Sequence, residues 1–339
     1  MPDTYLVMSE NHYFLRNAVN NVRATRARLA SLRARRGNFI TKRVRPRRDV
    51  PRHPKWTADL REDTAIVMQG PLRHEHDFTY ETVLRYRTNF PNAPIIVSTW
   101  DSEAGRATAA LEAAGAHVVT HQPPKTRGVK NSNLQMLSAA NGVAVAADLG
   151  ASFVLKTRTD QRLYSERLLG LLHATLEAFP LEAERGSQFR RLVGLSLNTF
   201  AYRMYGMSDM FTFGAIEDVS RYWDGTLDAR EFGESVEATT HREFAELQVC
   251  EVRYCSDFLK RTGWSLEWTL EDSWKAFACR FAVLDAAAVD LYWPKYSNKE
   301  ERWRSYEGDP RFLEVDFAMW MMMRSSSDVP NEEILDLSW

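Results

Sequence analysis

The chain has 339 residues, of which 44% are hydrophobic and 12% aromatic, and a formal net charge of −1. This composition is that of a folded protein with a large core and excludes a disordered chain. Three cysteines are too few for a disulfide framework or a four-ligand zinc site, and no run of about 18 apolar residues predicts a transmembrane helix. We therefore expect a cytoplasmic protein without a secretion signal.

The first 60 residues are strongly basic, with 14 Lys and Arg against 4 Asp and Glu. No acidic residue stands between Arg16 and Arg48, and apolar side chains recur among the arginines. Several of these apolar residues fall on one side of a helix, which predicts a basic, partly amphipathic N-terminal extension over residues 1–60. Pro46 and Pro51 indicate that it ends in a linker.

Two interpretations of residues 11–48 remain open. A basic amphipathic helix can lie on an anionic membrane surface, which would make the protein peripheral on the inner face of the cell membrane. The alternative is a solvated or partner-bound helical extension. Nucleic acid is not an expected partner, because no recognition motif accompanies the charges.

From Thr64 onward, short apolar runs alternate with helical segments. The runs predict four buried strands, at residues 64–68, 94–99, 116–120 and 151–155. Helices are expected between them, the last two over residues 104–114 and 131–150. This alternation predicts an α/β fold, a mostly parallel sheet with helices on both faces. Ligands of such sheets bind outside the carboxyl ends of the strands.

The second half of the chain is less regular. Residues 192–199 predict a further strand, and an apolar run occupies residues 210–213. Beyond Gly225 we expect a mainly helical, acidic segment.

Several well-known sites are excluded by their missing motifs. The chain has no GxGxxG after its first strand, no GxxxxGK[ST], no GxSxG and no HExxH. The segment KTRTDQR, residues 156–162, instead places a carboxylate among cations at a strand end. A nucleotide-sugar transferase needs this combination, because a carboxylate holds Mg²⁺ or Mn²⁺ while cations neutralise the diphosphate that leaves. The other interpretation is an internal ladder of ion pairs.

Six strings resemble, in the same order, the WavE lipopolysaccharide synthesis family. They are AIVMQGPL (65–72), YRTNFPNAPIIVSTWDSE (86–103), G-x-x-N-x-N-x-Q (128–135), LKTRTDQRLY (155–164), LSLNTFAYRMYGMSDMFTFG (195–214) and LYWPKY (291–296). The resemblance covers about residues 63–300 and implies a role in bacterial lipopolysaccharide core or capsule synthesis. It implies a GT-A-like glycosyltransferase with a nucleotide-sugar donor, a saccharide or glycolipid acceptor and no organic cofactor.

The resemblance also suggests how the chain is divided. A GT-A-like catalytic domain is expected over residues 61–300, with a donor half at 61–165 and an acceptor half at 166–300. Residues 301–339 are expected to form a C-terminal tail that packs on this body.

By the same resemblance, Asp160 corresponds to the last carboxylate of the GT-A Asp-x-Asp motif, which holds Mn²⁺ or Mg²⁺. Arg158 stands where the first aspartate would be. This cation either faces away along the strand or binds the diphosphate itself. The donor is expected to contact further residues around the strand ends: Gln69, Gly70, Asp101, Asn131, Asn133, Gln135, Lys156, Arg162 and Lys295.

An inverting transferase needs a carboxylate that takes the proton from the acceptor hydroxyl. Asp209 is the first choice for this base, because it lies between two predicted elements. Glu217, Asp218 and Glu246 are rivals, and capping of a helix or turn is the alternative role for Asp209.

Two other classes of function stay open. One is a transferase of sugar phosphate or polyol phosphate, which would release a nucleoside monophosphate. The other is a non-catalytic scaffold that binds glycolipid.

Overall fold

A computed structural model describes residues 61–181, 186–230, 238–293, 312–325 and 331–338. The chain divides into two compact units at Pro46, and all of these residues belong to the second. The N-terminal extension, its predicted membrane contact at residues 11–48 and Lys295 lie outside the described residues, as do parts of the C-terminal tail.

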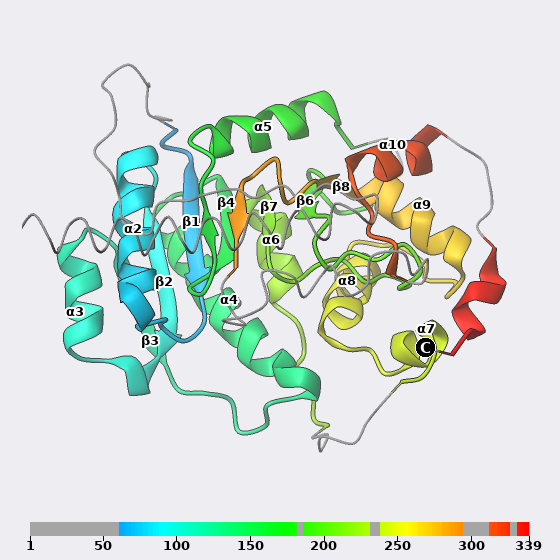
Figure 1. Cartoon of the computed structure of the whole chain (residues 1–339), viewed down its shortest axis with the longest axis horizontal. Helices are drawn as coiled ribbons and strands as arrows, with labels where there is room; N and C mark the ends of the chain where they lie inside the picture. The colour runs from blue at the N-terminus through cyan, green and yellow to red at the C-terminus, as the bar shows by residue number, and fades with distance from the viewer. Residues whose placement is uncertain (1–60, 182–185, 231–237, 294–311, 326–330, 339) are drawn as a thin grey trace, which may run out of the picture. The chain divides into compact units, whose positions relative to one another are not determined.

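A seven-stranded sheet in the order β3-β2-β1-β4-β7-β6-β8 forms the centre of the unit (Figure 1). Its strands are β1 (Thr64–Gln69), β2 (Ile95–Trp100), β3 (His117–His121), β4 (Phe153–Arg158), β6 (Leu192–Leu195), β7 (Thr212–Ala215) and β8 (Phe281–Leu284). All pairs are parallel except those of β7, which runs antiparallel to both β4 and β6. The predicted α/β fold with a mostly parallel sheet is therefore confirmed, and its first four strands form where the apolar runs predicted them.

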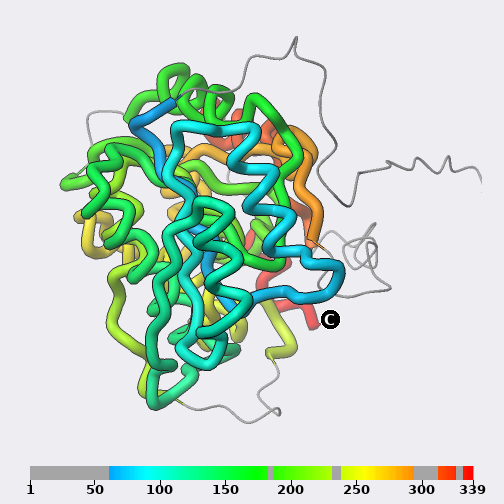
Figure 2. The backbone as a smooth tube through the Cα atoms, turned by 90° about the vertical axis from the view of Figure 1, so that its left-hand side faces the viewer, coloured from blue at the N-terminus to red at the C-terminus, as the bar shows by residue number. Residues whose placement is uncertain are grey.

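The helices flank the sheet and continue beyond its β8 end. They are α2 (Phe78–Asn89), α3 (Arg106–Ala113), α4 (Ser132–Asp148), α5 (Leu168–Ala178), α6 (Ile216–Trp223), α7 (His241–Glu246), α8 (Cys250–Arg261), α9 (Leu270–Arg280) and α10 (Phe317–Ser325). Figure 1 and, after a turn of 90°, Figure 2 show α2 and α3 beside the β3 end of the sheet.

The register of the strands assigns side chains to the two faces. Val67 on β1 pairs with Lys156 on β4, so both point to the face covered by α4 and α6. Gly142 of α4 has no side chain, and a Cβ there would stand 2.4 Å from Val67 Cγ1, so only glycine allows this close packing. Leu155 points to the other face, where α5 packs, as expected for a sheet with helices on both faces.

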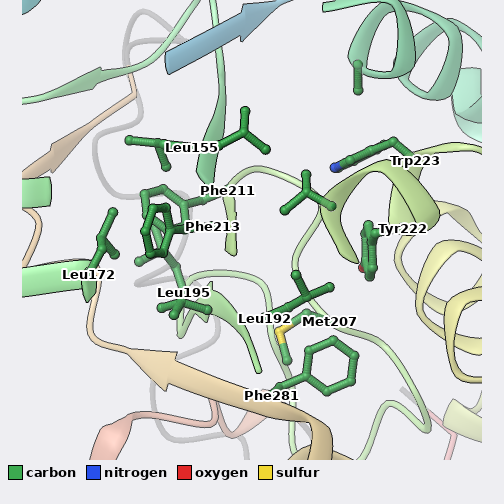
Figure 3. Packing of buried hydrophobic residues seen from close by; sticks show 14 of the residues in the cluster. Leu155, Leu172, Leu192, Leu195, Met207, Phe211, Phe213, Tyr222, Trp223 and Phe281 are labelled. Atoms are coloured by element: carbon green, nitrogen blue, oxygen red, sulfur yellow. The ribbon is translucent and has the colours of Figure 1, made fainter. Parts of the chain in front are cut away.

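The core extends across both faces of the sheet. Figure 3 shows Leu155, Leu172 and Phe213 gathered together, with Tyr222 and Trp223 of α6 set apart from them. Each of these side chains is buried or nearly so, and burying a large apolar side chain contributes about 1.5–3 kcal/mol.

The described chain beyond Gly225 is mainly helical, as predicted, and it also contains two short strands that were not predicted. Residues Phe281–Leu284 form β8, which adds a strand to the main sheet by pairing with β6. Leu291–Tyr292 form β9, which pairs with β5 (Arg162–Leu163) in a small second sheet. Runs this short cannot be told from helix by periodicity, and their partners are distant in sequence.

The described part of the C-terminal tail contacts the body. Helix α10 packs against α9 and β8, and Val315 and Trp320 are fully buried. The Trp320 indole donates to the backbone oxygen of Phe277 at 3.1 Å. Among the described residues, no helix is both long enough and apolar enough to span a bilayer.

Candidate functional site

One edge of the sheet collects most of the predicted site residues. Because β6 and β8 run parallel to β1, β2 and β4, their carboxyl ends all lie at this edge. Strand β7 runs the other way, with Thr212 beside Lys156 and Ala215 beside Phe153, so its beginning lies there too. Asp209 precedes β7 by three residues and therefore reaches the same edge as the end of β4.

Arg158 and Asp160 form an ion pair at the end of β4. The Arg158 Nε donates to Asp160 Oδ1 at 2.8 Å, and a terminal nitrogen donates to Oδ2 at 3.1 Å. Trp293 follows β9, and its Nε1 also donates to Asp160 Oδ2, at 3.1 Å. The Arg158 guanidinium lies 5.7 Å from the centre of the Trp293 ring. The pairing of β5 with β9 thus brings the distant Trp293 onto this ion pair.

The loop after β1 approaches β4 closely. Gly70 has a φ of 116°, and a Cβ there would stand 3.3 Å from Thr159 Oγ1. That hydroxyl donates to the backbone oxygen of Pro71 at 2.6 Å, while the Thr159 amide donates to Gln69 O at 3.1 Å. The end of β1 is therefore fixed next to Arg158.

Lys156 is fully buried on the face covered by α6. Its ammonium donates to the backbone oxygen of Asp209 and lies 4.1 Å from the centre of the Trp223 ring. Burial lowers the pKa of Lys156 to about 7, and Arg158 lowers it further, although Asp209 and Asp160 act in the opposite direction. Lys156 thus binds the loop that carries Asp209, so a direct contact with a donor would require it to leave these partners.

The Asp209 carboxylate has an unusual environment. Asp209 is only 5% exposed, yet its carboxylate has no hydrogen-bond partner in the described part of the chain. Its negative charge acts on Lys156, Glu251, Cys250 and other buried groups around it. Buried polar groups are normally hydrogen-bonded, so a carboxylate in this condition is a candidate for contact with a ligand.

Glu251, in the first turn of α8, is the neighbour that sequence reasoning missed. Asn198, just after β6, donates its side-chain amide to Glu251 Oε1, and Arg203 lies 3.6 Å from the same oxygen. Burial raises the pKa of Glu251, and the charge of Asp209 raises it further, while Arg203 lowers it. The only signal in the sequence is that Asn198 and Arg203 fall in the string at residues 195–214.

The segment Gly128–Gln135 binds other loops more than it faces the edge. Asn133 is fully buried; its side-chain nitrogen donates to the backbone oxygens of Thr126 and Asp228, and its oxygen accepts from the Asp228 amide. Gln135 donates to Cys250 Sγ at 3.7 Å. Asn131 is exposed at the N-cap of α4 with a φ of 66° and makes no side-chain capping bond.

Arg162 and Asp101 have protein partners of different kinds. Arg162 is buried, and it donates to Thr82 Oγ1 at 2.8 Å and to Phe78 O at 2.9 Å, which joins β5 to α2. Asp101, at the end of β2, is partly exposed and accepts from the side chain of Gln122 at 2.6 Å. Asp101 remains accessible at the predicted edge, whereas Arg162 is enclosed.

The rivals to Asp209 lie elsewhere. Glu217 and Asp218 follow β7, whose end is beside the start of β4, so they stand at the opposite edge of the sheet. Asp218 is also buried and accepts from the amides of Phe189 and Arg190, and burial raises its pKa. Glu246 is exposed at the end of α7. Glu217 and Asp218 therefore lie at the end of the sheet opposite to Arg158, which argues against either of them as the base for a substrate bound there.

Asp160 was predicted to hold Mn²⁺ or Mg²⁺, but both of its oxygens already accept from Arg158 or Trp293. Among the described residues, no three His, Cys, Asp or Glu side chains come together as metal ligands. The side chains at this edge therefore do not fit a cation held by the protein alone, and the metal at Asp160 stays a prediction.

Residues 64–295 match the model of a protein family described as WavE lipopolysaccharide synthesis. No curated protein matches the chain. Similar solved structures include a cytidylyltransferase from Leptospira borgpetersenii serovar Hardjo-bovis, with 10% identity, 48% of this chain and 64% of that chain covered, and a TM-score of 0.30. The chain thus spans less than two thirds of that enzyme.

Two further similar structures are transferases. One is glucosyl-3-phosphoglycerate synthase from Mycobacterium tuberculosis in complex with Mn²⁺, UDP and phosphoglyceric acid. The match has 12% identity and a TM-score of 0.32, and it covers 61% of this chain and 81% of the synthase. Mouse xyloside xylosyltransferase 1 shows 9% identity, 75% and 96% coverage, and a TM-score of 0.35. Because these TM-scores are below 0.5, no conclusion about this chain rests on them.

Proposed function

Because the chain belongs to the WavE lipopolysaccharide synthesis family, we propose that it is a glycosyltransferase that moves a sugar from a nucleotide-sugar donor to a saccharide or glycolipid acceptor. The observation that most supports this proposal is the Asp209 carboxylate. It is nearly buried, has no hydrogen-bond partner among the described residues, and lies at the sheet edge that also holds Arg158. A general base must have an oxygen available for the proton it takes, and Asp209 satisfies that condition.

In the proposed reaction, the oxygen of an acceptor hydroxyl attacks the anomeric carbon of the donor sugar and forms a new C–O bond. The bond between that carbon and the diphosphate oxygen breaks, and its electron pair leaves with the nucleoside diphosphate. The hydroxyl proton passes to Asp209. Lys156 holds the Asp209 backbone in place through its hydrogen bond. Less conformational entropy is therefore lost when the base is positioned for the reaction.

Arg158 is the proposed partner of the leaving diphosphate. Negative charge grows on the diphosphate as the bond breaks, and a guanidinium can hold two of its oxygens at once. In the free protein that guanidinium is paired with Asp160 in the same fork geometry. The diphosphate therefore competes with Asp160 for Arg158, and binding of the donor requires this ion pair to rearrange.

For the nucleoside, we propose contacts with Gln69, Gly70 and Asp101 at the ends of β1 and β2. Gly70 allows a ligand to approach the backbone, and Asp101 can accept from ribose or base. Asn133 and Arg162 are left out of the proposed donor site, because their side chains are buried in contacts between loops and helices.

The test is a thermal-shift series of the full chain with UDP-, GDP-, CMP- and CDP-linked sugars, each with Mn²⁺, with Mg²⁺ and with EDTA. We expect one nucleotide to stabilise the wild type and Asp209→Asn equally, and Arg158→Ala much less. Incubation with the matching donor and a lipopolysaccharide-derived acceptor should then release nucleoside diphosphate from the wild type only.

Other outcomes separate the remaining alternatives. Release of nucleoside monophosphate would assign the chain to the sugar-phosphate or polyol-phosphate transferases. Absence of stabilisation by every nucleotide would contradict the transferase proposal and favour a scaffold that binds glycolipid. If EDTA abolished donor binding and Arg158→Ala did not, the result would support the predicted metal site at Asp160.

A further inference from the structure

Glu251 is a second carboxylate near Asp209. Asn198, which donates to Glu251, is followed by Thr199, whose hydroxyl accepts from the Ser208 amide at 3.1 Å, and Ser208 precedes Asp209. Its Oε1 accepts from Asn198 and lies 3.6 Å from Arg203, and among the described residues only its own backbone amide also donates to the carboxylate. The Glu251 side chain is 16% exposed, so a ligand can reach it. Asn198 has a φ of 66°, a left-handed conformation that asparagine tolerates better than most residues, and this conformation directs its amide to Glu251.

Asp209 supplies an independent observation at the same place. At 5% exposure it is more than nine-tenths buried, and neither of its oxygens has a hydrogen-bond partner among the described residues. Burial raises the pKa of Glu251, and the charge of Asp209 also raises it, against the lowering effect of Arg203. Two largely buried carboxylates with few hydrogen-bond partners can accept hydrogen bonds from a ligand, which would offset the water that they lose on burial.

The chemistry of these carboxylate oxygens limits the class of ligand. Carboxylates accept hydrogen bonds and repel phosphate, so the donor diphosphate does not fit here and stays with Arg158. A saccharide offers neighbouring hydroxyl groups, each of which can donate to one carboxylate. No third His, Cys, Asp or Glu joins the two as a metal ligand within the described residues, which favours the hydroxyl groups over a cation.

We propose that Asp209 and Glu251 together form the acceptor subsite, which binds two neighbouring hydroxyl groups of a neutral saccharide. Asp209 takes the hydroxyl that attacks, and Glu251 holds the adjacent hydroxyl and so orients the ring. Asn198 and Arg203 position Glu251 from the other side. The role of Asp209 as the base for the attacking hydroxyl rests on the proposed function. Binding of the saccharide by the two carboxylates does not require a nucleotide-sugar donor.

The experiment measures saccharide binding without nucleotide. Saturation-transfer NMR of the full chain is recorded with methyl glycosides of the common hexoses and heptoses and with deacylated lipopolysaccharide core oligosaccharides. At least one should bind the wild type, and Asp209→Asn and Glu251→Gln should each raise its Kd about tenfold or more, because each loses a charge-assisted hydrogen bond. Asn198→Ala should weaken binding in the same direction by releasing Glu251.

Glu271→Gln is the matched control, since Glu271 is an exposed glutamate in the first turn of α9. It should bind like the wild type, and thermal unfolding should show that all variants are folded. Unchanged binding in Glu251→Gln, or no saccharide bound by the wild type, would overturn the proposal. So would stabilisation by Ca²⁺, Mg²⁺ or Mn²⁺ that depends on Glu251, because the pair would then be a cation site.

The nucleotide series separates this result from the proposed function. If nucleotides bind and saccharides do not, the acceptor subsite is wrong and the transferase proposal stands. If saccharides bind through Glu251 and nucleotides do not, the subsite stands in a protein that is not a nucleotide-sugar transferase.

Discussion

The ammonium of Lys156 on β4 donates to the backbone oxygen of Asp209, so the loop before β7 is bound to the strand that ends in Arg158. The same ammonium lies over the Trp223 ring, at 4.1 Å from its centre. A cation–π contact and one hydrogen bond replace only part of the water that a lysine loses on burial.

Lys156 therefore predicts a specific pH dependence of stability. Burial lowers its pKa to about 7 in the folded protein, whereas the pKa of an unfolded lysine is about 10.4. Between these values the unfolded chain binds the extra proton, so the free energy of unfolding should rise with pH, by at most about 1.4 kcal/mol per unit. Urea unfolding at pH 7, 8 and 9 should show this rise in the wild type but not in Lys156→Met, and parallel slopes would contradict it.

Arginine and lysine at position 158 should bind the nucleotide-sugar donor with different affinities. Arg158→Lys keeps the positive charge but loses the planar fork that can hold two diphosphate oxygens at once, so the affinity for a nucleotide sugar should fall about tenfold. Isothermal titration with the donor identified by thermal shift measures this Kd. Arg106→Lys, at an exposed position in α3, should leave the Kd unchanged. Equal affinities for Arg158→Lys and wild type would show that charge alone is needed.

Gly70→Ala should destabilise the protein more than Gly150→Ala. Both glycines have positive φ, 116° and 82°, so each substitution brings backbone strain of about 1–3 kcal/mol. At Gly70 the new Cβ also stands 3.3 Å from Thr159 Oγ1, whereas at Gly150 nothing lies within 4 Å. Urea midpoints measure the difference, and donor titration should show weaker binding for Gly70→Ala alone. A larger loss at Gly150 would contradict this account.

Asn133→Ala should lower stability without changing the affinity for the donor. The buried Asn133 side chain bonds both the amide and the carbonyl oxygen of Asp228, and each buried group left without a partner costs about 1–3 kcal/mol. Asn131→Gly, at an exposed position whose φ of 66° glycine also adopts without strain, should cost little. If Asn133→Ala instead weakened donor binding while the free energy of unfolding stayed constant, the donor contact predicted from the sequence would be correct after all.

The sequence predicts the sheet where each strand carries its own signal. Strands β1 to β4 are apolar runs bounded by glycine, proline or a helix, and they formed as expected. Strand β8 has no such boundary, because Phe281 follows α9 directly and its pairing with Leu192 depends on contacts far along the chain. Local patterns cannot report such pairing.

The same limit applies to the candidate site. The sequence places Arg158 and Asp160 at a strand end and Asp209 between two elements, and the structure brings them to one edge because β7 begins there beside the end of β4. Glu251 lies in a helix whose charges are typical of a solvated face, and only its contact with Asn198 distinguishes it. Asn133 is a polar residue of a type that often binds ligands, but its side chain bonds the backbone of Asp228, which is distant in the sequence. This structural role could not be predicted from local patterns.

The pairing of β5 with β9 has a consequence for the order of assembly during synthesis. All seven strands of the main sheet are complete at Leu284, before Leu291 and Trp293 leave the ribosome. Chains fold from the N-terminal side as they emerge, so the sheet can form while the Arg158–Asp160 pair still lacks its indole partner. A nascent chain would therefore acquire its architecture first, and the enclosure of its charged edge would be among the last steps.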